Sequence, residues 1–128
     1  MEAAQALREL MELSSQITNA VVLESNGSVL AASSTDPAAV DALTASTLEL
    51  VSAASELGSE GHEVTRVEVE LGEGAFFVVR EGGRTVAAVT GPKPTSGLVV
   101  YDLRTCVQSI DAPEAKKRRV SRKKEESE

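Results

Sequence analysis

Cys106 and His62 are the first residues to consider for chemistry, because they are the one cysteine and the one histidine of the 128-residue chain. A cysteine nucleophile needs a base or a positive charge beside it, whereas a buried cysteine behaves as a small apolar side chain. Cys106 continues an apolar stripe in VYDLRTCVQSI (100–110), which favours a core position over a nucleophile. One histidine and one cysteine do not make a zinc site, and the acidic residues lack the spacing of a calcium loop. We therefore predict no metal site and no cofactor.

Two glycine-containing segments, LGEG (71–74) and EGG (81–83), are candidates for phosphate binding. A phosphate-binding loop continues into a helix start or a Lys-Ser/Thr pair, and neither segment does so. Both segments are typical of tight turns between strands. The sequence therefore predicts no catalytic residue and a protein that is not an enzyme.

A basic run near the end of the sequence is the remaining chemical feature. Apolar periodicity stops after Ile110, and residues 111–128 carry 7 basic and 5 acidic side chains, so we expect a disordered charged tail there. The run could bind nucleic acid, a membrane or a nuclear import receptor, and RRVS (118–121) resembles a kinase site. A solvated tail without a defined role is the simpler interpretation. The basic residues of the run are Lys116, Lys117, Arg118, Arg119, Arg122, Lys123 and Lys124.

The charge and composition of the rest of the chain restrict its partners. Residues 1–110 carry 6 basic and 15 acidic side chains, and they predict one domain, 1–110, followed by the tail. Such an acidic body repels phosphate backbones and anionic lipid, and Phe76, Phe77 and Tyr101 are few platforms for stacked bases. We expect no specific nucleic acid and no membrane insertion. The single cysteine, the lack of a signal-like N-terminus and the lack of an apolar run of about 18 residues favour a cytoplasmic protein.

Hydrophobic periodicity predicts a short helix and then a hairpin at the start of the chain. Apolar runs at 20–24 and 29–32 flank Asn26-Gly27, which predicts a hairpin with a two-residue turn. The face of the helix that should point inward comprises Ala3, Leu7, Leu10, Met11, Ser14 and Ile17.

A longer helix is expected from Pro37 to Leu57, before Gly58. Asp36 can accept hydrogen bonds from the free N–H groups of the first turn, and proline is well tolerated at the first helical position. This helix has two faces of apolar or small residues, whereas a monomer with one core needs only one. The face expected on a sheet comprises Val40, Leu43, Thr47, Leu50, Val51, Ala54 and Leu57. The second face comprises Ala38, Ala42, Ala45 and Ala53.

Three strands are expected in the second half of the chain. Residues 64–71 alternate with period two, which predicts an edge strand with one wet face. Residues 76–79 and 85–89 are apolar on both faces and should lie at the centre of the sheet, joined by a turn at 81–84. The wet face of the edge strand comprises Val64, Arg66, Glu68 and Glu70.

The last apolar segment before the tail is predicted to be a helix. A strand would fit its alternation for a few residues, but about 13 residues without a turn signal favour a helix. Thr95 or Ser96, after Pro94, offers an N-cap. The apolar stripe of this helix comprises Val99, Leu103, Cys106, Val107 and Ile110.

The predicted order of helix, hairpin, long helix, three strands and helix resembles the roadblock/dynein light-chain family in its prokaryotic form. The resemblance covers roughly residues 4–110 and rests on VVLESNGSVLA (21–31), GAFFVV (74–79) and GPKPTSGL (91–98). The Pro-Lys-Pro before the last helix departs from the turn that is typical of the family. The resemblance implies a roadblock/profilin-like α/β (α+β) fold, in which helices cover both faces of a five-stranded antiparallel sheet of order α-β-β-α-β-β-β-α.

The resemblance also implies a function. Members of the family bind Ras-like small GTPases or serve as adaptors in larger assemblies, and they are homodimers in which long helices and third strands meet at a two-fold axis. We therefore expect a homodimeric, non-catalytic regulator or scaffold for a Ras-like small GTPase. A small-molecule sensor of similar architecture is the alternative, and the shortage of aromatic residues argues against it.

The dimer interface implied by the resemblance lies on the long helix and the third strand. A two-fold axis centred on Val67 would place Arg66 opposite Glu68 of the other chain, whereas an axis centred on Glu68 would oppose two like charges. We predict the first register. The predicted interface residues are Ala38, Ala42, Ala45, Glu49, Ala53, Arg66, Val67, Glu68 and Glu70.

Overall fold

The structure is a computed structural model that describes residues 1–58 and 64–110. His62 and the basic run, both singled out in the sequence, lie outside the described residues. The order of elements is the predicted one. The elements are α1 (Ala3–Leu13), β1 (Ile17–Leu23), β2 (Val29–Ala32), α2 (Pro37–Ser55), β3 (Arg66–Leu71), β4 (Gly74–Glu81), β5 (Arg84–Thr90) and α3 (Ser96–Gln108).

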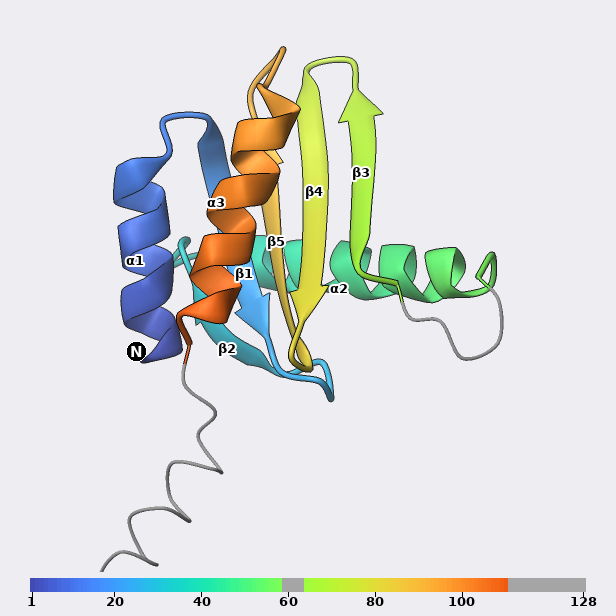
Figure 1. The fold of residues 1–128 in the computed structure, drawn as a ribbon, viewed down its shortest axis with the longest axis horizontal. Coiled ribbons are helices and arrows are strands. Elements are labelled where there is room, and N and C mark those ends of the chain that lie inside the picture. Colours follow the sequence, from blue (N-terminus) through green and yellow to red (C-terminus); the bar gives the residue numbers. More distant parts are fainter. Residues whose placement is uncertain (59–63, 111–128) are drawn as a thin grey trace, which may run out of the picture.

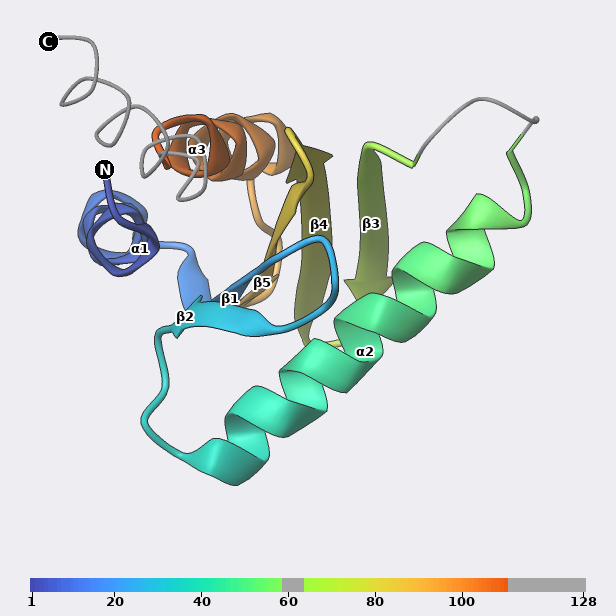
Figure 2. The same ribbon diagram turned by 90° about the horizontal axis from the view of Figure 1, so that it is seen from below.

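The five strands form one sheet in the order β2-β1-β5-β4-β3, and every neighbouring pair is antiparallel. Helices α1 and α3 lie side by side on one face of the sheet, and α2 crosses the other face (Figures 1 and 2). This arrangement confirms the predicted fold class. It also confirms β3 as an edge strand and β4 and β5 as interior strands.

Alternating side chains of the strands fill two core layers, one on each face of the sheet. Phe77 and Val79 of β4 pack with Leu103 of α3 in the first layer, and Phe76 and Val78 pack with α2 in the second. Cys106 is 5% exposed in the first layer, as its place in the apolar stripe predicts. The core is therefore built from both faces of the central strands, which explains why their sequences lack alternation.

The β4–β5 and β1–β2 hairpins close with different turns. Gly82 and Gly83 both adopt positive φ angles, 63° and 83°, in the predicted turn at 81–84. In the β1–β2 hairpin, the N–H of Glu24 donates to the carbonyl of Ser28, and the N–H of Gly27 donates to the carbonyl of Glu24. The loop therefore has three residues, and only Gly27 takes a positive φ, so the predicted two-residue turn is wrong.

Helix α2 begins as predicted and ends earlier. The carboxylate of Asp36 accepts a 3.1 Å hydrogen bond from the N–H of Ala38. The helix ends at Ser55, and Leu57 is 89% exposed, so its placement on the sheet-facing stripe is wrong. Figure 2 shows the reason, because the last turns of α2 extend past the β3 edge of the sheet.

The remaining differences concern element ends. Helix α1 stops at Leu13, and Ile17, predicted on its inner face, is the buried first residue of β1. Strand β3 begins at Arg66, two residues later than expected. Thr95 occupies the N-cap position of α3 without a side-chain capping bond, and its N–H donates to Oε1 of Gln16 at 2.6 Å.

Candidate protein-interaction site

The outer side of α2 is a face of small side chains exposed to solvent. Leu43 and Thr47 are the buried residues of this helix, and they point toward the sheet. The α2 residues predicted for an interface lie outside this buried pair. Ala38, Ala42, Ala45, Glu49 and Ala53 are all exposed.

Strand β3 forms one free edge of the sheet, and its side chains alternate between two environments. Val67 and Val69 are half-buried against the α2 layer, whereas Arg66, Glu68 and Glu70 are exposed on the other face. The carbonyl of Thr65 accepts a 2.9 Å hydrogen bond from the N–H of Arg80 in β4. Because backbone direction alternates along a strand, the odd-numbered residues of β3 bond to β4. The N–H and C=O groups of the even-numbered residues therefore point to the free edge.

An apolar cavity of about 550 Å³ lies between α2 and the β3 side of the sheet. Ser46 and Glu49 are the polar members of its lining, and the apolar members come from α2, β3, β4 and β5. Leu71 in this lining remains 43% exposed. A hollow of this kind at a sheet edge leaves apolar surface that a second molecule can cover. The lining is Leu43, Ser46, Glu49, Leu50, Ala53, Val69, Leu71, Phe76 and Val89.

The cavity brings together some of the predicted interface residues and leaves others apart. Glu49 and Ala53 share its wall with β3, as an interface built on α2 and β3 requires. Ala38 and Ala42 belong to the first turns of α2, at the end of the helix away from β3 (Figure 2). Leu71, Phe76 and Val89 of the lining were not predicted as part of a site. Their apolar character indicated burial in a sheet, and no pattern indicated that α2 leaves this part of the sheet uncovered.

One predicted interface residue has a partner within the chain. The hydroxyl of Ser96 donates to Oε2 of Glu68 at 2.8 Å, which links the start of α3 to the wet face of β3. A contact between residues 28 positions apart leaves no periodic signal in a sequence.

Two side chains with raised pKa values, Cys106 and Asp102, belong to α3, away from this site. Burial raises the pKa of the Cys106 thiol to about 11, which keeps it protonated and unreactive at neutral pH. Burial also raises the pKa of the Asp102 carboxyl above its usual value. Within residues 1–58 and 64–110, the His, Cys, Asp and Glu side chains form no group that could hold a metal ion. Among the same residues, no helix is both long and apolar enough to cross a membrane.

Comparisons with known proteins match this architecture. The model of the Roadblock/LC7 domain family matches residues 3–90, which end before α3. A Roadblock/LC7 domain from Streptomyces avermitilis is 25% identical, with a TM-score of 0.75 over 85% of this chain and 94% of that one. Gliding protein MglB from Thermus thermophilus is 17% identical, with a TM-score of 0.66 over 81% and 82%. Profilin II from Acanthamoeba castellanii is 16% identical, with a TM-score of 0.51 over 80% and 91%. A comparison with curated protein sequences gave no match.

Proposed function

The chain belongs to the Roadblock/LC7 domain family, and on that basis we propose that it is a non-catalytic homodimeric regulator or scaffold for a Ras-like small GTPase. The family relationship supports an adaptor that acts on small GTPases. The apolar cavity between α2 and β3 is the observation that most directly supports a homodimer. The protein acts through contacts rather than through chemistry.

The proposed dimer places α2 and β3 of one chain against the same elements of another. The partner's α2 covers the cavity and the small residues of the outer α2 face, where Ala45 and Ala53 allow two helices to approach closely. Burial of this apolar surface contributes a favourable term of about 25 cal/mol for each Å² removed from water, and the loss of translational and rotational freedom on association opposes it. The exposed side chains of β3 contribute mainly to specificity, because exposed charge pairs are weak.

The free edge of β3 limits how two chains can pair. Two β3 strands can form antiparallel hydrogen bonds only if each presents residues whose N–H and C=O groups point to the free edge. In β3 these are the even-numbered residues. An axis centred on Val67 pairs Arg66 with Glu68 of the other chain and meets this condition. An axis centred on Glu68 meets it too, but it places that carboxylate opposite its own copy. Charge therefore favours the Val67-centred register that we propose.

The GTPase proposal is tested by affinity capture with the full chain as bait. We expect a native lysate of the source organism to yield a Ras-like small GTPase, identified by mass spectrometry, whose retention differs between GTP and GDP. Measurement of GTP hydrolysis with and without the chain then separates stimulation of turnover from anchoring. If no small GTPase is retained with either nucleotide, the proposal is wrong.

A small-molecule sensor is the second candidate, because a cavity of about 550 Å³ is within the usual range for ligands. The same cavity cannot hold a ligand and be covered by a partner's helix. Light scattering of the purified chain distinguishes the two functions. A dimer mass supports the scaffold, and a monomer mass supports the sensor.

A further inference from the structure

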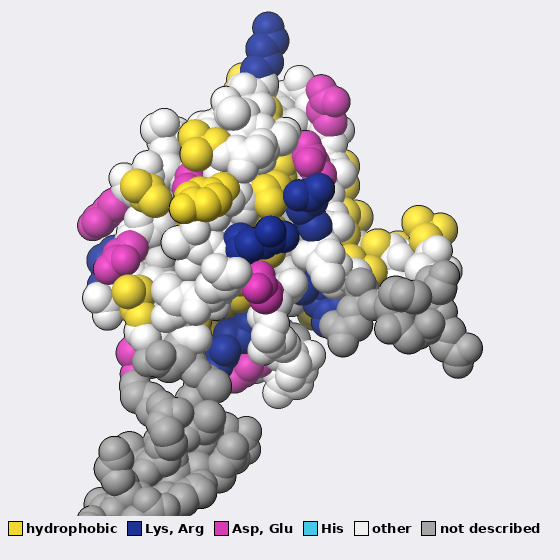
Figure 3. Space-filling model, in the orientation of Figure 1, with side chains coloured by type: hydrophobic (Ala, Val, Ile, Leu, Met, Phe, Trp, Pro, Cys, Tyr) yellow, Lys and Arg dark blue, Asp and Glu magenta, His cyan; other side chains and the backbone are white. Residues whose placement is uncertain are grey.

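The outer face of α3 carries exposed apolar side chains on the side of the sheet opposite to α2. Leu98 and Tyr101 are 50% and 67% exposed, whereas the opposite side of the same helix is buried. Leu13 at the end of α1 is 69% exposed, and the bond between Thr95 and Gln16 holds that end of α1 to the start of α3. Figure 3 shows hydrophobic side chains over α3 on this surface. Exposed apolar residues that gather in one place indicate a contact surface.

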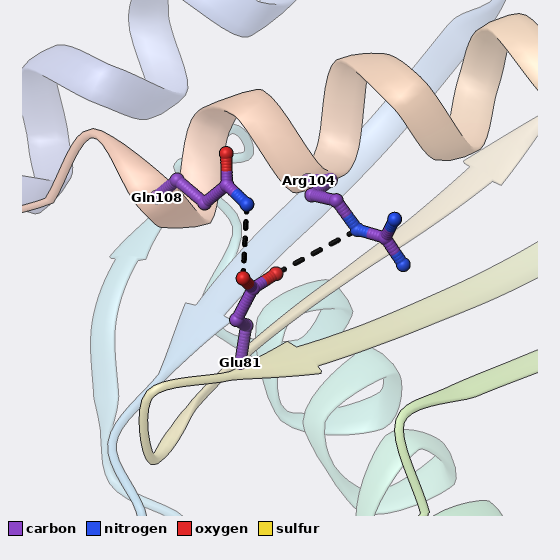
Figure 4. Close-up of polar contacts among 3 residues, drawn as sticks. All are labelled: Glu81, Arg104 and Gln108. Atoms are coloured by element: carbon purple, nitrogen blue, oxygen red, sulfur yellow. Dashed lines mark hydrogen bonds and ion pairs between the residues drawn. The ribbon is translucent and has the colours of Figure 1, made fainter.

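Arg104 follows Tyr101 by three residues and forms an ion pair with Glu81 of β4. Its Nε lies 3.6 Å from Oε1 of Glu81, and Nε2 of Gln108 donates to the other carboxylate oxygen at 2.9 Å. Figure 4 shows that the two terminal nitrogens of Arg104 point away from Glu81. The guanidinium therefore presents its outer N–H donors to an incoming group, and such a fork matches a carboxylate.

The exposed residues of α3 differ in charge from the exposed residues of α1 and α2. Exposed acidic residues occur on α1, at Glu9 and Glu12, and on α2, at Asp41 and Glu49. The acidic residue of α3, Asp102, is buried, so the exposed residues of α3 carry one positive charge and no negative one. Glu81 of β4 is the acid that Arg104 already contacts here, so an acidic partner meets less repulsion on α3 than on α1 or α2, in a body with 15 acidic and 6 basic side chains.

The spacing of these residues fits a helical partner. Leu98, Tyr101, Arg104 and Gln108 are separated by three or four positions, so they form one ridge along α3, roughly 15 Å long. Helices pack by setting such ridges into the grooves of a neighbour. We propose that the outer face of α3 binds an amphipathic helix of a partner protein, with apolar residues on Leu98 and Tyr101 and a carboxylate on Arg104. This surface lies on the face of the sheet opposite to α2, and Ser96, which bonds Glu68 of β3, is not part of the ridge.

A library of helical peptides displayed on phage, selected on the full-length chain, tests the proposal. We expect enriched peptides to combine a stripe of large apolar residues with Asp or Glu. Their Kd should rise about tenfold or more with Tyr101→Ala, because central aromatic and arginine contacts dominate such interfaces. Arg104→Glu should have a similar effect, and changing the peptide's acidic residue to Arg should restore binding to that variant. Arg104→Gln, which avoids repulsion of Glu81, should give a smaller loss.

Leu57→Ala is the matched control, because it removes an exposed apolar side chain at the end of α2. It should leave the peptide Kd unchanged. The proposal is overturned if no peptide is enriched, if the enriched peptides are basic, or if they bind the α3 variants as well as the original chain. It is also overturned if Tyr101→Ala lowers the mass measured by light scattering, because the occupant would then be a second copy of the chain. None of these outcomes depends on capture of a GTPase, so the two proposals can fail separately.

Discussion

Ser96 and Glu68 are joined by a hydrogen bond of 2.8 Å that connects the first turn of α3 to the edge strand β3. The bond crosses from the helix layer to the strand that we propose pairs with a second chain. The carboxylate of Glu68 is therefore already positioned in one chain. A residue of a second chain that contacts the Glu68 carboxylate across the dimer axis would therefore share this carboxylate with Ser96.

Ala45→Glu is expected to weaken the proposed dimer. Ala45 is exposed on the outer face of α2, and a carboxylate placed in a close contact between two helices would be left unpaired. We expect several kcal/mol of lost association, because unpaired buried charges are among the most costly changes at an interface. Light scattering over a micromolar concentration series measures it.

Ala4→Glu is the control for this change, because Ala4 is an exposed alanine of α1 on the opposite face of the sheet. It should leave the mass unchanged. A monomer mass for the unmodified chain would remove the basis of the prediction.

The sequence could predict those features that depend on neighbouring residues. The turn at 81–84 follows from two glycines that take positive φ angles, and the start of α2 follows from Asp36 and Pro37. The end of α2 could not be predicted, because Leu57 continues the helical pattern and only the width of the sheet leaves it exposed. The cavity at β3 was missed for the same reason. It depends on where one layer stops covering another.

Gly74→Ala is expected to destabilise the fold. Gly74 is the first residue of β4, and a Cβ at this position would overlap the carbonyl oxygen of Thr90 in β5. Forcing the two strands apart should cost about 1–3 kcal/mol, which lowers Tm by roughly 4–8 °C per kcal/mol in a domain of about this size. Thermal unfolding followed by circular dichroism measures the shift. Gly72→Ala is the control, because a Cβ there meets no atom within 4 Å.

Asp102→Asn is expected to stabilise the protein at neutral pH. Burial raises the pKa of the Asp102 carboxyl in the folded state, so the folded chain binds this proton more tightly than the unfolded chain does. The ionised group therefore destabilises the fold once the pH exceeds its folded pKa. The destabilisation fades as the pH falls from there toward the ordinary value of 3.8. Urea unfolding should show that Asp102→Asn increases the free energy of unfolding, and that this increase is larger at pH 7 than at pH 4. An equal gain at both pH values would contradict this account.

Cys106 is expected to resist thiol reagents in the folded protein. It is 5% exposed, and burial raises its pKa to about 11, so at pH 8 only about 0.1% of the thiol is ionised even where a reagent can reach it. We expect no reaction with Ellman's reagent within minutes under native conditions, and one thiol per chain in guanidinium chloride. Rapid native labelling would show that α3 opens readily from the sheet.

The register of β3 in the proposed dimer can be tested by a charge swap. An axis centred on Val67 forms two pairs between Arg66 of one chain and Glu68 of the other, each worth about 0.2–1 kcal/mol because the side chains are exposed. Arg66→Glu should therefore weaken the dimer modestly, since it sets two carboxylates against each other. Adding Glu68→Arg should restore it by forming both pairs in reverse.

The bond between Ser96 and Glu68 complicates this charge swap, because an arginine at position 68 cannot accept it. Ser96→Ala removes the bond while keeping the Glu68 charge, and at an exposed site it should cost no more than about 0.5–1.5 kcal/mol of stability. Dissociation constants for the original chain, Arg66→Glu, the double variant and Ser96→Ala separate the two effects. If the double variant dimerises no better than Arg66→Glu, while Ser96→Ala dimerises normally, the axis is not centred on Val67. The Glu68-centred register would then have to overcome its like-charge pair by other contacts, and Glu68→Gln should strengthen the dimer.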